Sequence, residues 1–165
     1  MSIKETHDFD KVRAIIKELK VAMLVTADDG LSMHARPMHT ADVDDENNIW
    51  FMTNENSEKV KEMINDHHVS LTYSCPQSGK YLSVTGTASF NDNQSRKDEL
   101  FNVFGKAWFP KGAEDPELLL IKINPDCAEY WETSSSKLVQ LFRVVKAVAT
   151  KSTYDGGEHG QVNNI

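Results

Sequence analysis

The sequence predicts a mainly β protein with helices (α+β), built as a small antiparallel β-barrel with short helices packed on its rim. Two segments, residues 69–73 and 82–90, alternate apolar and polar side chains, which is typical of strands with one buried face. Turn residues such as Asp28-Asp29-Gly30 separate neighbouring segments. Long helical patterns do not alternate with strands, so we do not expect a doubly wound parallel sheet.

The first quarter of the chain predicts a helix followed by a hairpin. Apolar residues recur at helical spacing after a possible N-cap, Asp8. They are Phe9, Val12, Ile15, Ile16 and Leu19. Residues 21–26 and 31–43 then flank a turn in which Gly30 suits a positive φ. An unbroken apolar run in residues 48–53 indicates a strand that is covered on both faces.

The rest of the chain predicts further strands and helices. Strands are expected at residues 69–73, 82–90, 118–123 and 128–132, the last two forming one long strand or a bent pair. Helices are expected at residues 57–65, 94–105 and 138–149. The helix at 94–105 is expected to bury Leu100, Phe101, Val103 and Phe104. We therefore expect one domain over residues 1–149 and a polar, glycine-rich tail at 150–165 that folds little on its own.

Composition excludes several classes of function. The chain has 165 residues, a net charge of −7 and only four arginines, whereas nucleic-acid binding needs clustered basic residues, so we expect no nucleic-acid partner. No apolar run approaches the roughly 20 residues that a membrane span requires, and the N-terminal residues are charged where a signal peptide would be apolar. These features predict a soluble cytoplasmic protein without a membrane partner.

Metal and nucleophile sites receive no support from the sequence. His34 and His39 would face opposite sides of a strand, His67 and His68 are adjacent, and the two cysteines form no CxxC pair. No Ser/His/Asp or Cys/His arrangement stands out. We predict no metal site and assign no catalytic residue.

An anion site is predicted at the start of the helix at 57–65. Ser57 is placed as its N-cap, and the free amides of Glu58 and Lys59 and the Lys59 ammonium meet where the helix dipole favours negative charge. Arg36, on a preceding strand, can close the other side as a bidentate fork for a phosphate. The alternative is an ordinary capped surface helix with a solvated lysine.

The surroundings of this site favour the phosphate interpretation. In an extended strand His34, Arg36 and Met38 share one face, so a cation and a soft apolar side chain point the same way. The apolar residues 50–52 precede Ser57 by one short loop. An apolar slot beside a phosphate cradle suits a flat, phosphorylated ring system.

Seven short motifs, taken in order over roughly residues 8–149, resemble those of a known family. They are Ala35-Arg36-Pro37-Met38, Ile49-Trp50-Phe51-Met52-Thr53, Ser57-Glu58-Lys59-Val60, Val69-Ser70-Leu71, Ser83-Val84-Thr85-Gly86-Thr87-Ala88, Trp108-Phe109-Pro110 and Ala128-Glu129-Tyr130-Trp131. Each motif is weak alone, but their order and spacing are specific. The chain resembles the pyridoxamine 5′-phosphate oxidase-like FMN-binding split barrels, of the general stress protein type.

The resemblance implies a six-stranded split barrel over residues 1–149 and a homodimer with FMN in a cleft at the dimer interface. It implies that three residues, Arg36, Ser57 and Lys59, bind the FMN phosphate, with a hydroxyl from Thr53 nearby. It further implies that Met38, Phe51 and Met52 border the isoalloxazine, that Pro37 belongs to the cofactor-binding residues, and that Trp108 approaches from the partner subunit.

The same resemblance limits the expected activity. Pyridoxamine phosphate oxidases hold the substrate phosphate with a C-terminal arginine and histidine, whereas no arginine follows Arg143 here. We therefore do not expect that activity. We expect FMN as cofactor and a small-molecule electron donor or acceptor, with flavin as hydride carrier in an oxidoreductase. The alternatives are a flavin carrier or stress sensor without turnover, and a split-barrel dimer that binds haem or a deazaflavin.

Overall fold

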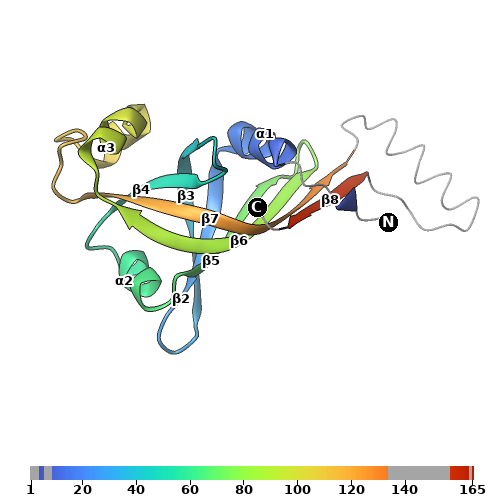
Figure 1. The fold of residues 1–165 in the computed structure, drawn as a ribbon, viewed down its shortest axis with the longest axis horizontal. Helices are drawn as coiled ribbons and strands as arrows, with labels where there is room; N and C mark the ends of the chain where they lie inside the picture. Colours follow the sequence, from blue (N-terminus) through green and yellow to red (C-terminus); the bar gives the residue numbers. More distant parts are fainter. Residues whose placement is uncertain (1–3, 6–8, 134–156, 164) are drawn as a thin grey trace, which may run out of the picture.

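Six strands close into an antiparallel β-barrel in the computed structural model, which describes residues 4–5, 9–133, 157–163 and 165. The barrel strands are β2 (Val21–Ala27), β3 (Met33–Val43), β4 (Ile49–Asn54), β5 (His68–Cys75), β6 (Lys80–Asn91) and β7 (Leu118–Glu132). Their order is β7-β4-β3-β2-β5-β6, and a β6–β7 pairing closes the ring. The predicted fold class is confirmed: the protein is mainly β, with a few short helices around the barrel (Figure 1).

Within the part of the chain that the structure describes, four short helices accompany the barrel. They are α1 (Asp10–Leu19), α2 (Glu58–Asn65), α3 (Gln94–Leu100) and α4 (Val103–Trp108). Figure 1 shows α1 and α2 on opposite sides of the sheet and α3 beyond the strand ends. No helix within the described ranges is long and apolar enough to cross a membrane.

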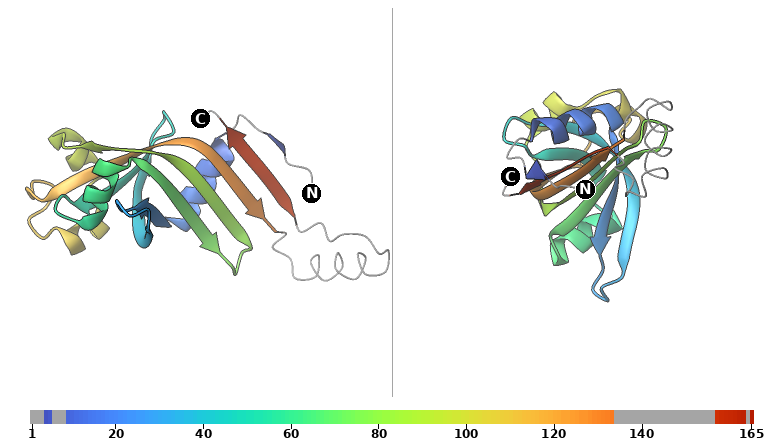
Figure 2. Two further views of the ribbon diagram at one scale, coloured as in Figure 1. Left: turned by 90° about the horizontal axis from the view of Figure 1, so that it is seen from below. Right: turned by 90° about the vertical axis from the view of Figure 1, so that its right-hand side faces the viewer.

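The longest strand, β7, holds two parts of the sheet together. One edge pairs with β6 along almost its whole length. The other edge pairs with β4 over residues 118–123 and with β8 (Glu158–Asn163) over residues 127–132. β8 in turn pairs with the two-residue strand β1 (Lys4–Glu5), so the sheet continues beyond the barrel (Figure 2). The two alternatives for residues 118–132 are thereby resolved in favour of one long strand.

Part of the segment 150–165, which was expected to fold little on its own, pairs as strand β8 with the edge of β7. The free edge of β7 supplies hydrogen-bond partners to this polar segment, and Val162 buries its side chain in the main core. A Cβ on Gly160 would lie 2.4 Å from the Tyr130 ring, so glycine is needed for this close approach. The helix expected at 138–149 and the domain boundary after 149 lie outside the described residues.

Helix α1 fills one side of the main core, as its apolar spacing predicts. Val12, Ile15 and Ile16 are at most 2% exposed and belong to the main core cluster. The N-cap position is occupied by Phe9, whose carbonyl accepts a hydrogen bond from the Arg13 amide at 2.8 Å. Asp8 was expected to cap this helix, but the burial of Phe9 in the core fixes the helix start one residue later.

In the β2–β3 turn the residue with a positive φ is not the predicted Gly30 but its neighbour Leu31. Leu31 has φ 64°, and Gly30 does not have a positive φ. The Asp28 carboxylate accepts hydrogen bonds from the amides of Gly30 (2.9 Å) and Ser32 (2.8 Å), which fixes the turn around an aspartate. Leu31 is 80% exposed, so no packing opposes its unusual backbone.

The single helix expected at 94–105 is two helices, α3 and α4. The Asn102 side chain accepts hydrogen bonds from the amides of Phe104 (2.9 Å) and Gly105 (3.2 Å) and so starts a new helix. This break rotates the second helix, and Val103 and Phe104, which were expected to be buried, are 77% and 55% exposed. A local side-chain cap therefore outweighs the apolar spacing here.

Candidate functional site

Strands β3 and β4 diverge at the site predicted to bind an anion. Their pairing runs over residues 40–43 and 49–51. Within the described residues, the rest of β3 pairs only with β2, and residues 52–54 of β4 pair only with β7. Helix α2 begins four residues after β4 and contacts β2. Side chains from all four elements meet where the two strands separate.

The predicted residues Thr53, Ser57 and Lys59 are brought together. The Lys59 ammonium donates a hydrogen bond to Thr53 Oγ1 at 3.2 Å, and that oxygen lies 3.4 Å from Ser57 Oγ. Thr53 is 4% exposed and Lys59 is half-buried. Burial lowers the pKa of Lys59, the charge of Arg36 lowers it further, and Glu62 opposes both effects. Lys59 thus shares its surroundings with a second cation.

The start of α2 leaves backbone donors available. Ser57 occupies the N-cap position, but its side chain makes no capping hydrogen bond. Its carbonyl accepts from the amides of Val60 (3.0 Å) and Lys61 (3.4 Å). The preceding amides, of Glu58 and Lys59, have no intrahelical partner because they lie in the first turn. The predicted N-cap position is confirmed, although the hydroxyl is held at Thr53 instead of at the helix amides.

Arg36 is held by two groups that the sequence did not indicate. Its guanidinium donates to Glu62 Oε2 at 2.9 Å and to the Thr26 hydroxyl, which in turn donates to Glu62. His34 Nδ1 lies 2.6 Å from the other Glu62 oxygen. The register places His34, Arg36 and Met38 directly opposite Thr26, Leu24 and Ala22 of β2, which confirms that these three β3 residues share one face.

Glu62 is the buried anion of this cluster. Its exposure is 8%, and burial alone would raise its pKa. Hydrogen bonds from Thr26, His34 and Arg36, together with the Arg36 charge, outweigh burial and lower the pKa to about 2. Glu62 is therefore ionised throughout the physiological range and offsets one of the two cations, Arg36 and Lys59.

The cluster keeps donors that are suitable for an anion after these internal contacts. A guanidinium has five N–H groups, and Arg36 uses two of them in the contacts above. The Lys59 ammonium and the first-turn amides of α2 add to these donors. With Arg36, Lys59 and Glu62 charged, the cluster carries a net charge of about +1 in a chain whose net charge is −7.

Glu62 was missed, although the sequence held a signal for it. Lys59, Glu62 and Met63 lie at i, i+3 and i+4, so they share a helix face, and Met63 is buried in the main core. A carboxylate on that buried face requires a partner. Thr26 and His34 could not be found in this way because only the β2–β3 register brings them to α2.

The remaining predicted site residues are placed around the cluster or away from it. Met38 and Met52 are half-buried, and Met52 Sδ would lie 3.2 Å from a Cβ on Gly105 of α4. The Phe51 side chain is fully buried in the main core, so only its backbone could face a ligand. Pro37 is exposed opposite Met23.

Trp108, expected to approach a partner's cofactor, is the last residue of α4 and is 83% exposed. Its side chain makes no hydrogen bond or ring contact with any residue that the structure describes. By contrast, its neighbour Phe109 is 6% exposed. The structure therefore leaves Trp108 available for a contact outside the described chain.

The adjacent histidines converge more closely than the sequence suggested. The rings of His67 and His68 stack at 4.5 Å, and each offers a nitrogen within 4.8 Å of an Asp66 oxygen and of the other. Asp66 already accepts hydrogen bonds from the amide and the ring of His68. Both imidazoles are exposed. We interpret the group as surface side chains that contact one another after the end of α2, and we assign no metal to it.

The fold and the cluster define a small closed antiparallel barrel with a cationic site where two of its strands separate. Residues 7–155 match the family model of pyridoxamine 5′-phosphate oxidase-like proteins. The chain belongs to this family, in agreement with the resemblance of its motifs.

Solved structures support the general stress protein type. A protein from Jannaschia sp. CCS1, assigned as general stress protein 26, aligns with a TM-score of 0.76 and 25% identity, covering 93% of this chain and 96% of that one. A general stress FMN/FAD-binding protein from Xanthomonas citri aligns with a TM-score of 0.66 and 26% identity, covering 77% of this chain and 89% of that one.

A curated relative matches over a shorter region. Protein bli-3 of Neurospora crassa is 26% identical over an alignment of 110 residues that covers 62% of this chain and 53% of the relative. The chain therefore spans about half the length of the curated relative that it matches.

Proposed function

We propose that this protein binds FMN, with the phosphate at the cluster of Arg36, Thr53, Ser57 and Lys59. The observation that carries the proposal is the Lys59–Thr53–Ser57 contact set beside Arg36, at the first turn of α2. A phosphate dianion would meet charge-assisted donors and free helix amides there. The similarity to an FMN/FAD-binding general stress protein supports the same ligand class.

The residues of the site would make different contributions to FMN binding. Lys59 would contribute charge, and Thr53 and Ser57 would contribute hydroxyl groups that burial already orients. Arg36 would contribute directional N–H donors, because Glu62 offsets its charge. Met38 and Met52 offer polarisable, half-buried surface for a planar ring. When bound, FMN would supply hydride or electron transfer at its isoalloxazine, and the chain's residues would bind and orient it.

Titration of the purified protein with FMN tests this proposal. We expect stoichiometric quenching of flavin fluorescence and a rise in melting temperature that grows with FMN concentration. Absence of both effects at saturating FMN would contradict FMN binding. Haem and a deazaflavin without a phosphate, titrated in parallel, should bind more weakly than FMN, because the donors are arranged for a phosphate.

The phosphate assignment is tested by comparing FMN with riboflavin, which lacks the phosphate. Lys59→Gln should weaken FMN binding by about tenfold or more and leave riboflavin nearly unchanged. Lys61→Gln is the matched control, since Lys61 lies on the same helix but is exposed and paired with Glu58. Equal losses for the two flavins would argue against a phosphate at Lys59. Arg36 is a poorer choice because its loss also leaves Glu62 unpaired.

We further propose that the protein is a flavin-dependent oxidoreductase that acts on a small-molecule donor or acceptor. Anaerobic addition of NADH or NADPH to the FMN complex should bleach the flavin absorbance. A flavin that binds but does not turn over would favour the carrier or sensor alternative. In that case neither NADH nor NADPH reduces the bound flavin, and the flavin reduced by dithionite transfers no electrons to the acceptors tested. These assays distinguish loss of binding from loss of turnover.

A homodimer is the proposed assembly. On the outer face of β2, Val21 is 48% and Met23 39% exposed, and Met33 of β3 is 77% exposed on the same face. Apolar patches of this kind favour association. Sedimentation analysis should give twice the monomer mass, and Met23→Lys should shift the protein towards monomer. A wild-type monomer at all concentrations would contradict this assembly.

A further inference from the structure

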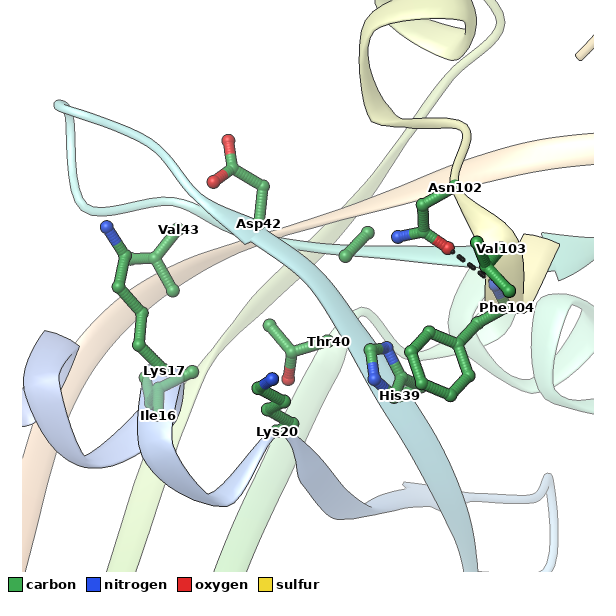
Figure 3. A pocket seen from close by; sticks show the side chains of 11 residues that line it. Ile16, Lys17, Lys20, His39, Thr40, Asp42, Val43, Asn102, Val103 and Phe104 are labelled. Carbon is green, nitrogen blue, oxygen red and sulfur yellow. Dashed lines mark hydrogen bonds between the residues drawn. The ribbon is translucent and has the colours of Figure 1, made fainter.

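A concave site lies on another part of the barrel wall, away from the cluster at α2. A pocket of about 380 Å³ is formed between α1, the second half of β3 and the start of α4 (Figure 3). None of the proposed phosphate ligands lines it. Its volume is near the lower end of the range for small-molecule pockets, which suits a compact ligand of one or two rings.

One wall of the pocket is a stacked pair of rings. The His39 and Phe104 rings lie 4.0 Å apart, centroid to centroid, with an interplanar angle of 24° (Figure 3). Phe104 is 55% exposed, so this ring is held at the pocket edge without being buried. Burial and the nearby charge of Lys20 lower the pKa of His39, which favours its neutral ring. The pair presents a flat, uncharged surface of the kind on which planar molecules stack.

The opposite side carries two lysines with no partner. Lys17 and Lys20, at the end of α1, line the pocket, and within the described residues neither makes an ion pair or a hydrogen bond through its ammonium group. Asp42 also lines the pocket, but its carboxylate is bound by Arg96 at 3.1 Å. The two ammonium groups are therefore the charges lining this pocket that no described residue pairs.

The helix dipole alone does not explain why both Lys17 and Lys20 lie at the end of α1. Cations near a helix C-terminus are stabilised by the helix dipole, which is sufficient reason for one of them. Lys20, however, has φ 62° and ψ −33°, a left-handed backbone conformation that glycine adopts more readily. A lysine is thus kept at a strained position where its side chain borders an apolar hollow.

We propose that this pocket binds a small organic anion with a planar apolar body, such as an aromatic carboxylate. The ring would lie against the His39–Phe104 pair, and the carboxylate would be held by Lys20 and Lys17. Recognition at this site needs neither flavin nor the cluster around Lys59. It goes beyond the proposed function, because it assigns a separate ligand class to a separate group of residues.

The test uses 1-naphthoate as the anionic probe and 1-naphthalenemethanol as its neutral counterpart. Calorimetric titration of the full chain, with and without FMN, should show saturable binding of naphthoate and at least about tenfold weaker binding of the alcohol. Naphthoate affinity should fall as salt is raised, because the contact is between charges near the surface. Binding without FMN separates this proposal from the flavin proposal.

Variants locate the probe. Lys17→Gln/Lys20→Gln should lower naphthoate affinity by about tenfold or more, and the matched control Lys61→Gln/Lys111→Gln, which changes net charge equally at exposed sites, should leave it unchanged. Phe104→Ala should weaken both probes. All five residues are exposed, so the variants should fold.

Three outcomes would overturn the proposal. They are no saturable binding of naphthoate, equal affinity for the neutral alcohol, and equal losses in the two double variants. NMR titration gives an independent check: amide shifts confined to the outer face of β2 would also contradict a site between α1, β3 and α4.

Discussion

The two cationic regions of the barrel treat their charges in opposite ways. At α2, Arg36 is bound by Glu62 and Thr26, and Lys59 is bound by Thr53. At the pocket beside α1, Lys17 and Lys20 have no partner within the described residues and extend from an exposed helix end. The first region is a partly buried network of paired charges, whereas the second is an exposed rim of unpaired charges.

This difference separates charges that also stabilise the fold, at α2, from charges that are available only to a ligand, at the pocket. A buried charge needs compensation in the absence of ligand, so the α2 cluster has its own anion, and removing that anion should destabilise the fold. An exposed charge is compensated by water and contributes little to folding. Substitutions in the two regions should therefore affect stability very differently, even where both affect ligands.

The largest expected effect is the loss of Glu62. Glu62→Ala leaves Arg36, whose side chain is 22% exposed, without its carboxylate, and should lower the free energy of unfolding by about 3 kcal/mol. Urea denaturation measures this. Glu58→Ala, on the same helix with a side chain that is 78% exposed, should change it by less than about 1 kcal/mol. Similar effects of the two substitutions would remove the distinction between the regions.

Acid should weaken the same network. The folded-state pKa of Glu62 is about 2 against an ordinary 4.5, so the unfolded state takes up the proton first as the pH falls. The stabilisation is complete above pH of about 4.5 and is lost progressively down to about pH 2. Glu62→Gln should flatten this part of the stability curve, measured by denaturation at a series of pH values. An unchanged slope would mean that Glu62 does not titrate in this way.

At the pocket, the stacked ring should contribute modestly. Phe104→Ala removes the contact with His39 and should lower the free energy of unfolding by about 1 kcal/mol. Val103→Ala is the control, since Val103 is adjacent, 77% exposed and has no ring to stack. It should change stability by less than about 0.5 kcal/mol. A difference of zero between them would show that the stack does not hold in solution.

The smallest effect should have the opposite sign. Lys20→Gly relieves the positive φ and should raise the free energy of unfolding by about 0.5 kcal/mol, while weakening naphthoate binding at the pocket. Lys20→Gln keeps the strained backbone and should leave stability within about 0.5 kcal/mol while weakening the probe. Destabilisation by Lys20→Gly would mean that this backbone is not strained.

Much of the fold could be predicted because its signals are local. Alternation in residues 82–90 identifies β6, and the apolar run in residues 48–53 identifies β4 with both faces covered. The helix break at Asn102 and the strand at Glu158–Asn163 were not predicted. The first depends on one side-chain cap that competes with apolar spacing, and the second on an edge of β7 that exists only after folding.

The candidate site shows the same division. Ser57 and Lys59 could be placed together because they lie in one helical turn after one strand, and Arg36 could be placed on a strand face by its alternation with Met38. The sequence could not show that Glu62 holds Arg36, nor that the rings of His39 and Phe104 meet. Those contacts join residues 26 and 65 positions apart, and only strand register and helix packing bring them together.

By itself, the sequence determined the family, the mainly β character and the residue types at the start of α2, since motif order, alternation and capping are properties of neighbouring residues. The tertiary structure decided which charges are compensated. Whether Arg36 or Lys20 has a partner depends on what the folded chain places within a few ångströms of it and on how much water it excludes, and neither quantity is written in the local pattern.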